Sequence, residues 1–187
     1  MTYEAIVIGG GVMGCMAAYT LAERGMHNIL LLEHARLGDA ATGQSAAMLM
    51  HQTGDMFLSQ LARASIETYE EISQRSSLAI DLVRTGSVLF TTKPEHLSIL
   101  EGMQRIQDEL GIDSRFISTS EIEGLCPGFS TTTIAGAVYC GLDGYLSARG
   151  LLQELRSRMQ EKGVTVCQRR PVTFVRTMPR GEGFVVG

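Results

Sequence analysis

Three glycines near the N-terminus follow the pattern Gly9-x-Gly11-x-x-Gly14, and glycines at this spacing suit the binding of a pyrophosphate. The first permits a tight turn, the second lets the backbone approach the phosphates, and the third lets a helix pack close against a strand. The free N–H groups and the positive pole at the start of that helix stabilise negative charge without a basic side chain. The pattern is informative when a strand precedes it and a helix follows it.

Both neighbouring elements are predicted from the residues. Ala5–Ile8 is a short apolar run rich in β-branched residues. Val12–Arg24 has small residues at helical spacing and is followed by Gly25, where a left-handed cap is easiest for glycine. Asn28–Leu32 supplies a second strand. The first 33 residues therefore predict a dinucleotide-binding βαβ unit.

An acidic residue closes the second predicted strand. Glu33 lies nineteen residues beyond Gly14, and Ala18 and Gly25 continue the small-residue spacing between them. A carboxylate at this place can accept hydrogen bonds from both hydroxyls of an adenosine ribose, and it repels a 2′-phosphate. NADP is therefore disfavoured as the cofactor.

The segment after Glu33 bears on the choice between FAD and NAD. A nicotinamide-binding fold normally continues with another helix and a third parallel strand, whereas here Gly38–Ala47 is a small-residue loop. Its N–H groups can line the pyrophosphate and flavin end of an extended dinucleotide, which favours FAD. The alternatives are a flexible surface loop and a fragment of an NAD-dependent dehydrogenase.

Hydrophobic periodicity and capping residues predict the other elements. Further helices are expected after Asp55 (apolar face Leu58, Leu61, Ala62, Ile66, Tyr69 and Ile72), from Pro94, after Ser118 and Glu121, which have capping-box spacing, and at Ala148–Lys162 behind Ser147. Further strands are expected at Ser87–Thr91, Arg115–Ile117, Ile134–Tyr139, Val164–Cys167, Val172–Val175 and Phe184–Val186.

Composition excludes several classes of protein. Sixteen Lys and Arg against twenty Asp and Glu give a net charge of -4, with no basic cluster longer than Arg169–Arg170, which argues against a nucleic-acid partner. No apolar stretch approaches the roughly 18 residues of a membrane span, and no secretion signal is recognisable, so we expect a cytoplasmic protein. The four cysteines are scattered without metal-ligand spacing, so we expect reduced thiols and no metal site.

Several stretches of the chain resemble the FAD-dependent amine oxidoreductases typified by D-amino-acid oxidase, glycine oxidase and sarcosine oxidase. They are EAIVIGGGVMGCMAAYTLAERG with Glu33, then ATGQSAAMLM, RTGSVLF, GLDGYLSARGLLQEL and GVTVCQRRPVTFV. The resemblance implies an α/β fold, in which a Rossmann-like FAD-binding domain is interleaved with an antiparallel-sheet substrate domain. Residues 1–85 and 147–187 would belong to the FAD-binding domain and residues 86–146 to the substrate domain, with the family's C-terminal half truncated.

The resemblance also assigns cofactor contacts by matching position. It implies backbone contacts of Val12 and Met13 with the pyrophosphate, contacts of Glu33 and His34 with the ribose and adenine, a loop beside the cofactor at Ala41, Thr42, Ala46, Ala47 and Met48, and a backbone contact of Val172 with the adenine. Some relatives attach their flavin through a histidine. The residues around His51 do not match those enzymes, so we expect FAD to be bound without a covalent link.

A complete member of this family would oxidise an amine beside a carboxylate to an imine by hydride transfer to the flavin, which O₂ or an electron carrier reoxidises. The family's catalytic residues lie in the missing half, so none is assigned, and Arg84, Arg149 and Tyr145 are expected to be solvated. A different class of function is also open, namely a natural short, non-catalytic dinucleotide-binding subunit or remnant. Exposed strand edges make self-association into an oligomer plausible.

Overall fold

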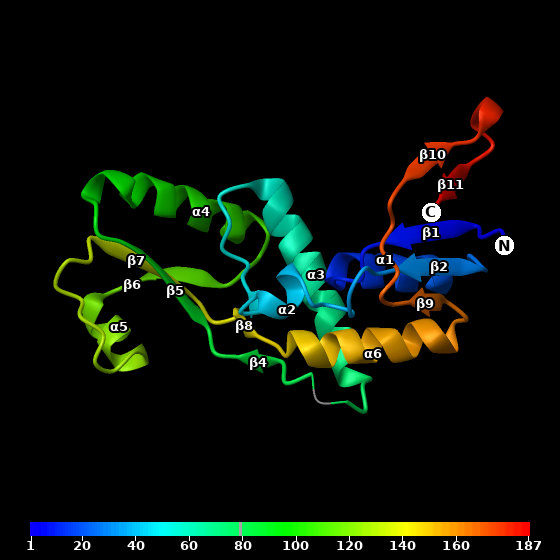
Figure 1. Cartoon of the computed structure of the whole chain (residues 1–187). Coiled ribbons are helices and arrows are strands. Elements are labelled where there is room, and N and C mark those ends of the chain that lie inside the picture. Colours follow the sequence, from blue (N-terminus) through cyan, green and yellow to red (C-terminus); the bar gives the residue numbers. More distant parts are fainter. Residues whose placement is uncertain (79) are drawn as a thin grey trace. The chain divides into compact units, whose positions relative to one another are not determined.

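The computed structural model describes residues 1–78 and 80–187, which fall into two compact units (Figure 1). The first unit comprises Met1–Ala46, Ser76–Ile80 and Ser147–Gly187, and the second comprises Ala47–Arg75 and Asp81–Leu146. The chain thus leaves the first unit and returns to it. The assignment of residues 1–85 and 147–187 to FAD binding and of residues 86–146 to substrate binding stays a prediction.

The first unit is built on a parallel sheet with the strand order β1-β2-β9. Helix α1 contacts β1 and β2, and helix α6 contacts both α1 and β9. Its elements are β1 (Ala5–Ile8), α1 (Val12–Glu23), β2 (Ile29–Leu32), α2 (Ala41–Gln44), α6 (Ala148–Glu161), β9 (Thr165–Cys167), β10 (Val175–Thr177), the 3₁₀ turn η2 (Pro179–Gly181) and β11 (Phe184–Val186).

The predicted βαβ unit is confirmed, because β1 and β2 pair in parallel on either side of α1 in the sequence. Gly25 has the left-handed backbone expected of it, with φ of +87°. The core contains Cys15 and Ala18 of α1, Leu31 of β2 and Leu155 of α6, all fully buried. A small side chain at Ala18 lets the helix lie close to its neighbours.

The second unit contains an antiparallel sheet of order β5-β7-β6 and a smaller antiparallel sheet of order β3-β8-β4. Helix α4 packs against β6 and β7, and a cluster of Ile117, Ile122 and Ala137 forms a core. The elements are β3 (Met48–Leu49), α3 (Met56–Gln74), β4 (Val83–Arg84), β5 (Ser87–Thr91), the 3₁₀ turn η1 (Pro94–His96), α4 (Leu97–Glu109), β6 (Ser114–Ile117), α5 (Thr119–Leu125), β7 (Gly136–Cys140) and β8 (Gly144–Tyr145).

The predicted helix starts are confirmed by their hydrogen bonds. Asp55 Oδ1 accepts from the Leu58 N–H at 2.9 Å, and Ser147 Oγ accepts from the Gly150 N–H at 3.0 Å. Ser118 and Glu121 form the predicted capping box. The pKa of Glu121 falls to about 2 because it accepts hydrogen bonds from Ser118 and from Arg115. These caps satisfy N–H groups that the first turn of a helix leaves open.

Two predicted elements differ in the structure, and the apolar face of a third, which was predicted correctly, is only partly buried. The segment Gly38–Ala47 is not all loop, because the Gln44 N–H donates to the Ala40 carbonyl at 3.2 Å and closes the short helix α2. The strand expected at Val172–Val175 starts only at Val175, because the N–H groups before it bond to Gly187 instead of a regular ladder. On α3, Ile66 is 3% exposed but Leu58 is 53% exposed, so the apolar face is only partly buried.

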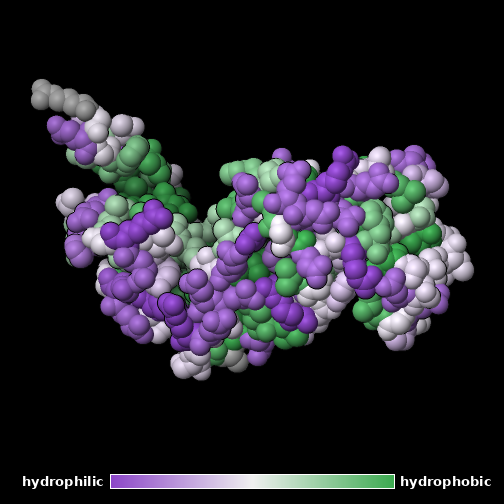
Figure 2. Space-filling view, turned by 180° about the vertical axis from the view of Figure 1, so that it is seen from behind, coloured by the Kyte–Doolittle hydropathy of each residue, from purple (hydrophilic) through white to green (hydrophobic). Residues whose placement is uncertain are grey.

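The β10–β11 hairpin carries apolar side chains on its surface, seen as green in Figure 2. Phe184 is 68% exposed, and Val175 and Val185 are also exposed. A two-stranded hairpin is marginally stable alone, so these side chains are available to pack against another segment or chain. Within residues 1–78 and 80–187, none of the helices has both the length and the apolar character that a bilayer span requires.

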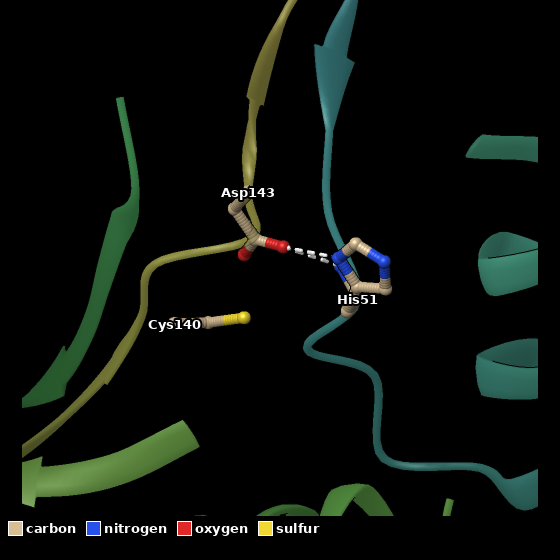
Figure 3. Close-up of side chains that lie close together, drawn as sticks. All are labelled: His51, Cys140 and Asp143. Atoms are coloured by element: carbon tan, nitrogen blue, oxygen red, sulfur yellow. Dashed lines mark hydrogen bonds and ion pairs between the residues drawn. The ribbon is translucent and has the colours of Figure 1, made fainter. Parts of the chain in front are cut away.

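Asp143 is a buried carboxylate that joins three segments of the second unit (Figure 3). Its Oδ1 accepts from the backbone N–H of His51 and lies 2.8 Å from His51 Nδ1. Because an ionised carboxylate only accepts, Nδ1 carries the proton. Its Oδ2 accepts from Ser87 Oγ at 2.6 Å and from Gln52 Nε2 at 3.4 Å. Burial alone would raise the pKa of Asp143, but the hydrogen bonds from His51 and Ser87 outweigh it and hold the pKa below its usual range.

We predict that Asp143→Asn lowers the free energy of unfolding by about 3 kcal/mol at pH 7, because it removes one partner of a buried pair. The folded-state pKa of Asp143 is lowered, so its contribution is present above the unfolded pKa of about 4 and is lost as the pH falls through the folded pKa. The difference between wild type and variant should therefore shrink in acid. Urea unfolding at several pH values measures this.

The matched control is Asp108→Asn, because Asp108 is exposed on α4. It should change the free energy of unfolding by no more than about 0.5 kcal/mol. Equal stabilities of Asp143→Asn and wild type at pH 7 would show that the buried network contributes nothing to the fold.

Candidate functional site

The glycine turn lies between β1 and α1, and two of its glycines are required by the backbone. Gly9 has φ of +106°, a conformation that favours glycine, and its N–H donates to the Leu32 carbonyl at 2.8 Å. A Cβ added at Gly14 would overlap the carbonyl oxygen of Gly9. The start of α1 can therefore lie against the turn only because Gly14 has no side chain.

The two glycines between them are also confined. A Cβ at Gly11 would lie 3.1 Å from Thr42 Oγ1, and a Cβ at Gly10 would overlap Leu37 and approach Glu33. Gly10 occupies the variable position of the pattern, so spacing alone assigned it no role. The structure shows that this position too has little room for a side chain.

Glu33 follows β2 and is only 7% exposed. Its Oε2 accepts from the Gly10 N–H at 2.6 Å, and its Oε1 accepts from the Ala35 N–H at 2.8 Å and lies 2.7 Å from Nδ1 of the exposed His34. Burial would raise the pKa of Glu33, but the hydrogen bonds from Ala35 and Gly10 outweigh burial and lower it. Glu33 is therefore an ionised carboxylate attached to the glycine turn.

The predicted cofactor loop docks onto the same turn. Thr42 Oγ1 accepts from the Val12 N–H at 3.0 Å, and the Gly38 N–H donates to the Gly10 carbonyl at 3.0 Å. Val12 was predicted to offer its backbone to the pyrophosphate, and in the structure this N–H is bonded to Thr42. Met13 beside it is strongly exposed. The first turn of α1 and the segment around α2 thus form one surface.

Val172 lies in the first unit, beyond β9. Two residues earlier, the Arg170 N–H donates to the Glu33 carbonyl at 2.9 Å, and the Arg169 N–H donates to the Ala35 carbonyl at 2.9 Å. These bonds hold the segment before Val172 beside the end of β2. The segment that continues to Val172 therefore passes beside Glu33, the predicted ribose-binding residue.

The structure groups part of the predicted site and leaves part of it separate. The predicted residues joined by the turn, β2 and α2 in the first unit are Gly9, Gly11, Val12, Met13, Gly14, Glu33, His34, Ala41 and Thr42. Ala46 is the exposed last residue of this stretch of the first unit, whereas Ala47 and Met48 belong to the second unit. The cofactor contacts of all these residues stay predictions.

The residues present fit the AMP and pyrophosphate end of a dinucleotide. Glycines line the turn, the N-terminus of α1 faces it with the Val12 N–H bonded to Thr42, and a buried ionised carboxylate stands at the end of β2. The helix pole suits phosphate, and the carboxylate suits ribose hydroxyls and rejects a 2′-phosphate. Glu33, Thr42 and the glycine turn are the residues that would hold the cofactor here.

His51, Cys140 and Asp143 form a second cluster, in the other unit, whose possible metal-ligand atoms all lie within 4.8 Å of one another (Figure 3). The His51 and Asp143 atoms already bond directly to each other. Burial and the charge of Asp143 raise the pKa of the Cys140 thiol to about 11. This arrangement is that of a hydrogen-bond network.

Sequence reasoning considered His51 only as a site of covalent flavin attachment and assigned no role to Asp143. Their separation of 92 residues leaves no local signal of the pair. Arg84, expected in solvent, is half-buried and donates through Nε to Glu70 Oε1 at 3.0 Å. Both pairs can be recognised only from the fold.

The chain was compared with known proteins. The model of the FAD dependent oxidoreductase family, DAO, matches residues 4–187. Among curated proteins, the chain is 27% identical over 172 residues to the mitochondrial pyruvate dehydrogenase phosphatase regulatory subunit of Mus musculus, covering 92% of this chain and 20% of that protein. It is 26% identical over 176 residues to the mitochondrial sarcosine dehydrogenase of Homo sapiens, covering 94% of this chain and 19% of that protein.

Among solved structures, the glycine oxidase of Geobacillus kaustophilus superposes with a TM-score of 0.82 and 25% identity, over 98% of this chain and 50% of that one. The chain thus spans about half the length of glycine oxidase and about a fifth of the two mitochondrial proteins. The alternative of an NAD-dependent dehydrogenase fragment is not supported, because the match is to a flavin family. The family match over residues 4–187 and the geometry of the glycine turn lead to one conclusion: the chain belongs to the FAD dependent oxidoreductase family.

Proposed function

We propose that the protein is an FAD-dependent oxidoreductase that oxidises the C–N bond of an amino acid or an N-methyl amino acid. The proposal that FAD is the cofactor rests on the glycine turn, to which Glu33 and Thr42 are both bonded. The reaction class rests on the similarity to proteins named sarcosine dehydrogenase and glycine oxidase. An amine substrate, and O₂ or an electron carrier as the final acceptor, are part of the same proposal.

The residues of the first unit would hold FAD at its AMP and diphosphate end. The start of α1 stabilises the diphosphate, and Glu33 accepts from the ribose hydroxyls. Bound FAD would accept the two electrons that leave the substrate as a hydride. We propose that it is bound without a covalent link, because the residues around His51 do not match those of relatives that attach their flavin through a histidine.

A second candidate function is a binding subunit without catalysis. It is favoured by the similarity to a protein named as a regulatory subunit, which is as close as the similarity to sarcosine dehydrogenase. Such a subunit would keep the glycine turn and Glu33 but would not reduce its flavin with an amine.

We predict that the protein expressed from its complete reading frame is yellow, and that sarcosine, dimethylglycine, glycine or proline bleaches its visible flavin absorbance without O₂. Methylamine, which lacks the carboxylate, is the control and should leave the absorbance unchanged. Bound FAD that none of these amino acids reduces would overturn the proposed reaction and favour the binding subunit.

We predict that Glu33→Gln raises the FAD dissociation constant about tenfold or more. The amide turns an NH₂ group toward the N–H donors that now bond to the carboxylate, and the loss of a hydrogen bond to a charged group is worth about 1.5–3 kcal/mol. Titration of the apoprotein, followed by quenching of flavin fluorescence, measures the constant. The control is Glu23→Gln, an exposed member of an ion pair with Lys162, and affinity should be unchanged.

We predict that Gly14→Ala destabilises the FAD-loaded protein by about 2 kcal/mol or more and lowers its FAD content, because the added Cβ overlaps backbone at Gly9. Gly102→Ala is the matched control, since a Cβ at Gly102 in α4 meets nothing within 4 Å. It should be neutral or slightly stabilising. Thermal unfolding and the ratio of flavin to protein absorbance distinguish the two variants, and an identical response of both would refute the steric argument.

A further inference from the structure

A pocket of about 350 Å³ lies in the first unit, between the segment that follows β2 and the N-terminal half of α6. Arg36, Arg149 and Arg156 line it, together with Asp39, Leu152 and Gln168. Neither Glu33 nor the residues of the glycine turn line this pocket. Gly38, Asp39 and Gly43, which also line it, belong to the segment that docks onto the glycine turn, so the pocket adjoins the surface assigned above to the dinucleotide without including Glu33 or the turn.

One wall of the pocket is a single face of α6. Arg149, Leu152, Gln153 and Arg156 line it at spacings of three, four and seven residues, which places them in one stripe of the helix. Leu152 is buried at the floor, where a Cβ on Gly38 would overlap it. The backbone at Gly38 therefore closes the hollow against the helix, and two arginines stand along one side of it.

The opposite wall comes from the carboxyl ends of two parallel strands. Arg36 follows β2, and Gln168 follows β9 directly. Gln168 Oε1 accepts from the Leu37 N–H at 2.9 Å, which leaves its NH₂ group as a donor. Ligands of parallel α/β sheets bind outside the carboxyl ends of the strands, and this pocket has that location.

The charges in the pocket are unbalanced. In the part of the chain that the structure describes, the guanidinium groups of Arg36, Arg149 and Arg156 form no ion pair. Asp39 is the acid among the lining residues, and its Oδ2 accepts from the backbone N–H of Arg36. Arg158 on the same helix differs, because it bonds to Glu154 at 2.6 Å.

We infer that this pocket binds a multiply charged oxyanion, a phosphate or a dicarboxylate, at the same time as FAD occupies its own site. Like charges gathered in one hollow repel one another, and an oxyanion relieves that repulsion. Guanidinium groups bond phosphate and carboxylate oxygens in a bidentate way. The positive pole at the start of α6, where Ala148 and Arg149 line the pocket, adds to the attraction.

The test uses the FAD-loaded protein from the complete reading frame, titrated calorimetrically with inorganic phosphate or with succinate at constant ionic strength. The double variant Arg149→Gln/Arg156→Gln should raise the dissociation constant of the anion about tenfold or more. The single variant Arg149→Gln should raise it less. Both side chains are exposed, so FAD content and thermal unfolding should be unchanged. The comparison of phosphate with succinate identifies which oxyanion the pocket prefers.

The matched control is Arg75→Gln/Arg105→Gln, which removes the same charge at two exposed positions of the second unit. Its affinity for the anion should equal that of wild type. The inference is overturned if neither anion binds saturably, if the double variant binds as tightly as wild type, or if the anion displaces FAD, which would place it at the diphosphate site instead. Loss of FAD from wild type without any anion would instead count against the proposed cofactor site.

Discussion

The hydrogen bond from the Gly10 N–H to the Glu33 carboxylate organises the first unit at the point where β1 and β2 end. A tight turn at this place buries a backbone donor, and a buried donor without a partner costs about 1–3 kcal/mol. Glu33 satisfies that donor from the neighbouring strand and accepts from the Ala35 N–H with its other oxygen. One side chain therefore shapes the turn and supplies the negative charge that distinguishes ribose hydroxyls from a 2′-phosphate.

The second unit also contains a buried carboxylate, Asp143, whose hydrogen-bond acceptor positions are occupied by other groups of the protein. An ionised carboxylate offers about four acceptor positions. At Asp143 the backbone N–H and ring of His51, the Ser87 hydroxyl and the Gln52 amide supply four donors, so nothing remains for a ligand. At Glu33 the Gly10 and Ala35 N–H groups donate from the backbone, and the other contacts include the ring of His34, which is exposed. Asp143 is therefore assigned to the fold, whereas at Glu33 a ribose hydroxyl could take the place of the exposed His34 ring.

Local signals predicted much of this architecture, because caps and glycine turns act within a few residues. Strands and helices of four or more residues with apolar periodicity were predicted, with ends displaced by up to three positions. Helix α2 was missed, since its four residues have no apolar periodicity and are held by bonds to Gly38 and Val12. The two-residue strands were missed because they are too short to show periodicity and are formed by pairing with distant residues. Leu49, for example, pairs with Gly144.

The same limit applies to the sites. The glycine spacing and Glu33 predict where the dinucleotide end would bind because a βαβ unit brings neighbouring strands together in a fixed way. No pattern joins Arg36 to Arg149, and Arg149 alone looks like a solvated arginine at a helix start. The parallel pairing of β2 with β9 and the close approach of Gly38 to α6 bring the two arginines to one hollow. In the two proposed sites, an acid would therefore face one ligand position at this sheet edge and arginines would face a neighbouring one, so that groups of opposite charge would select different parts of their ligands.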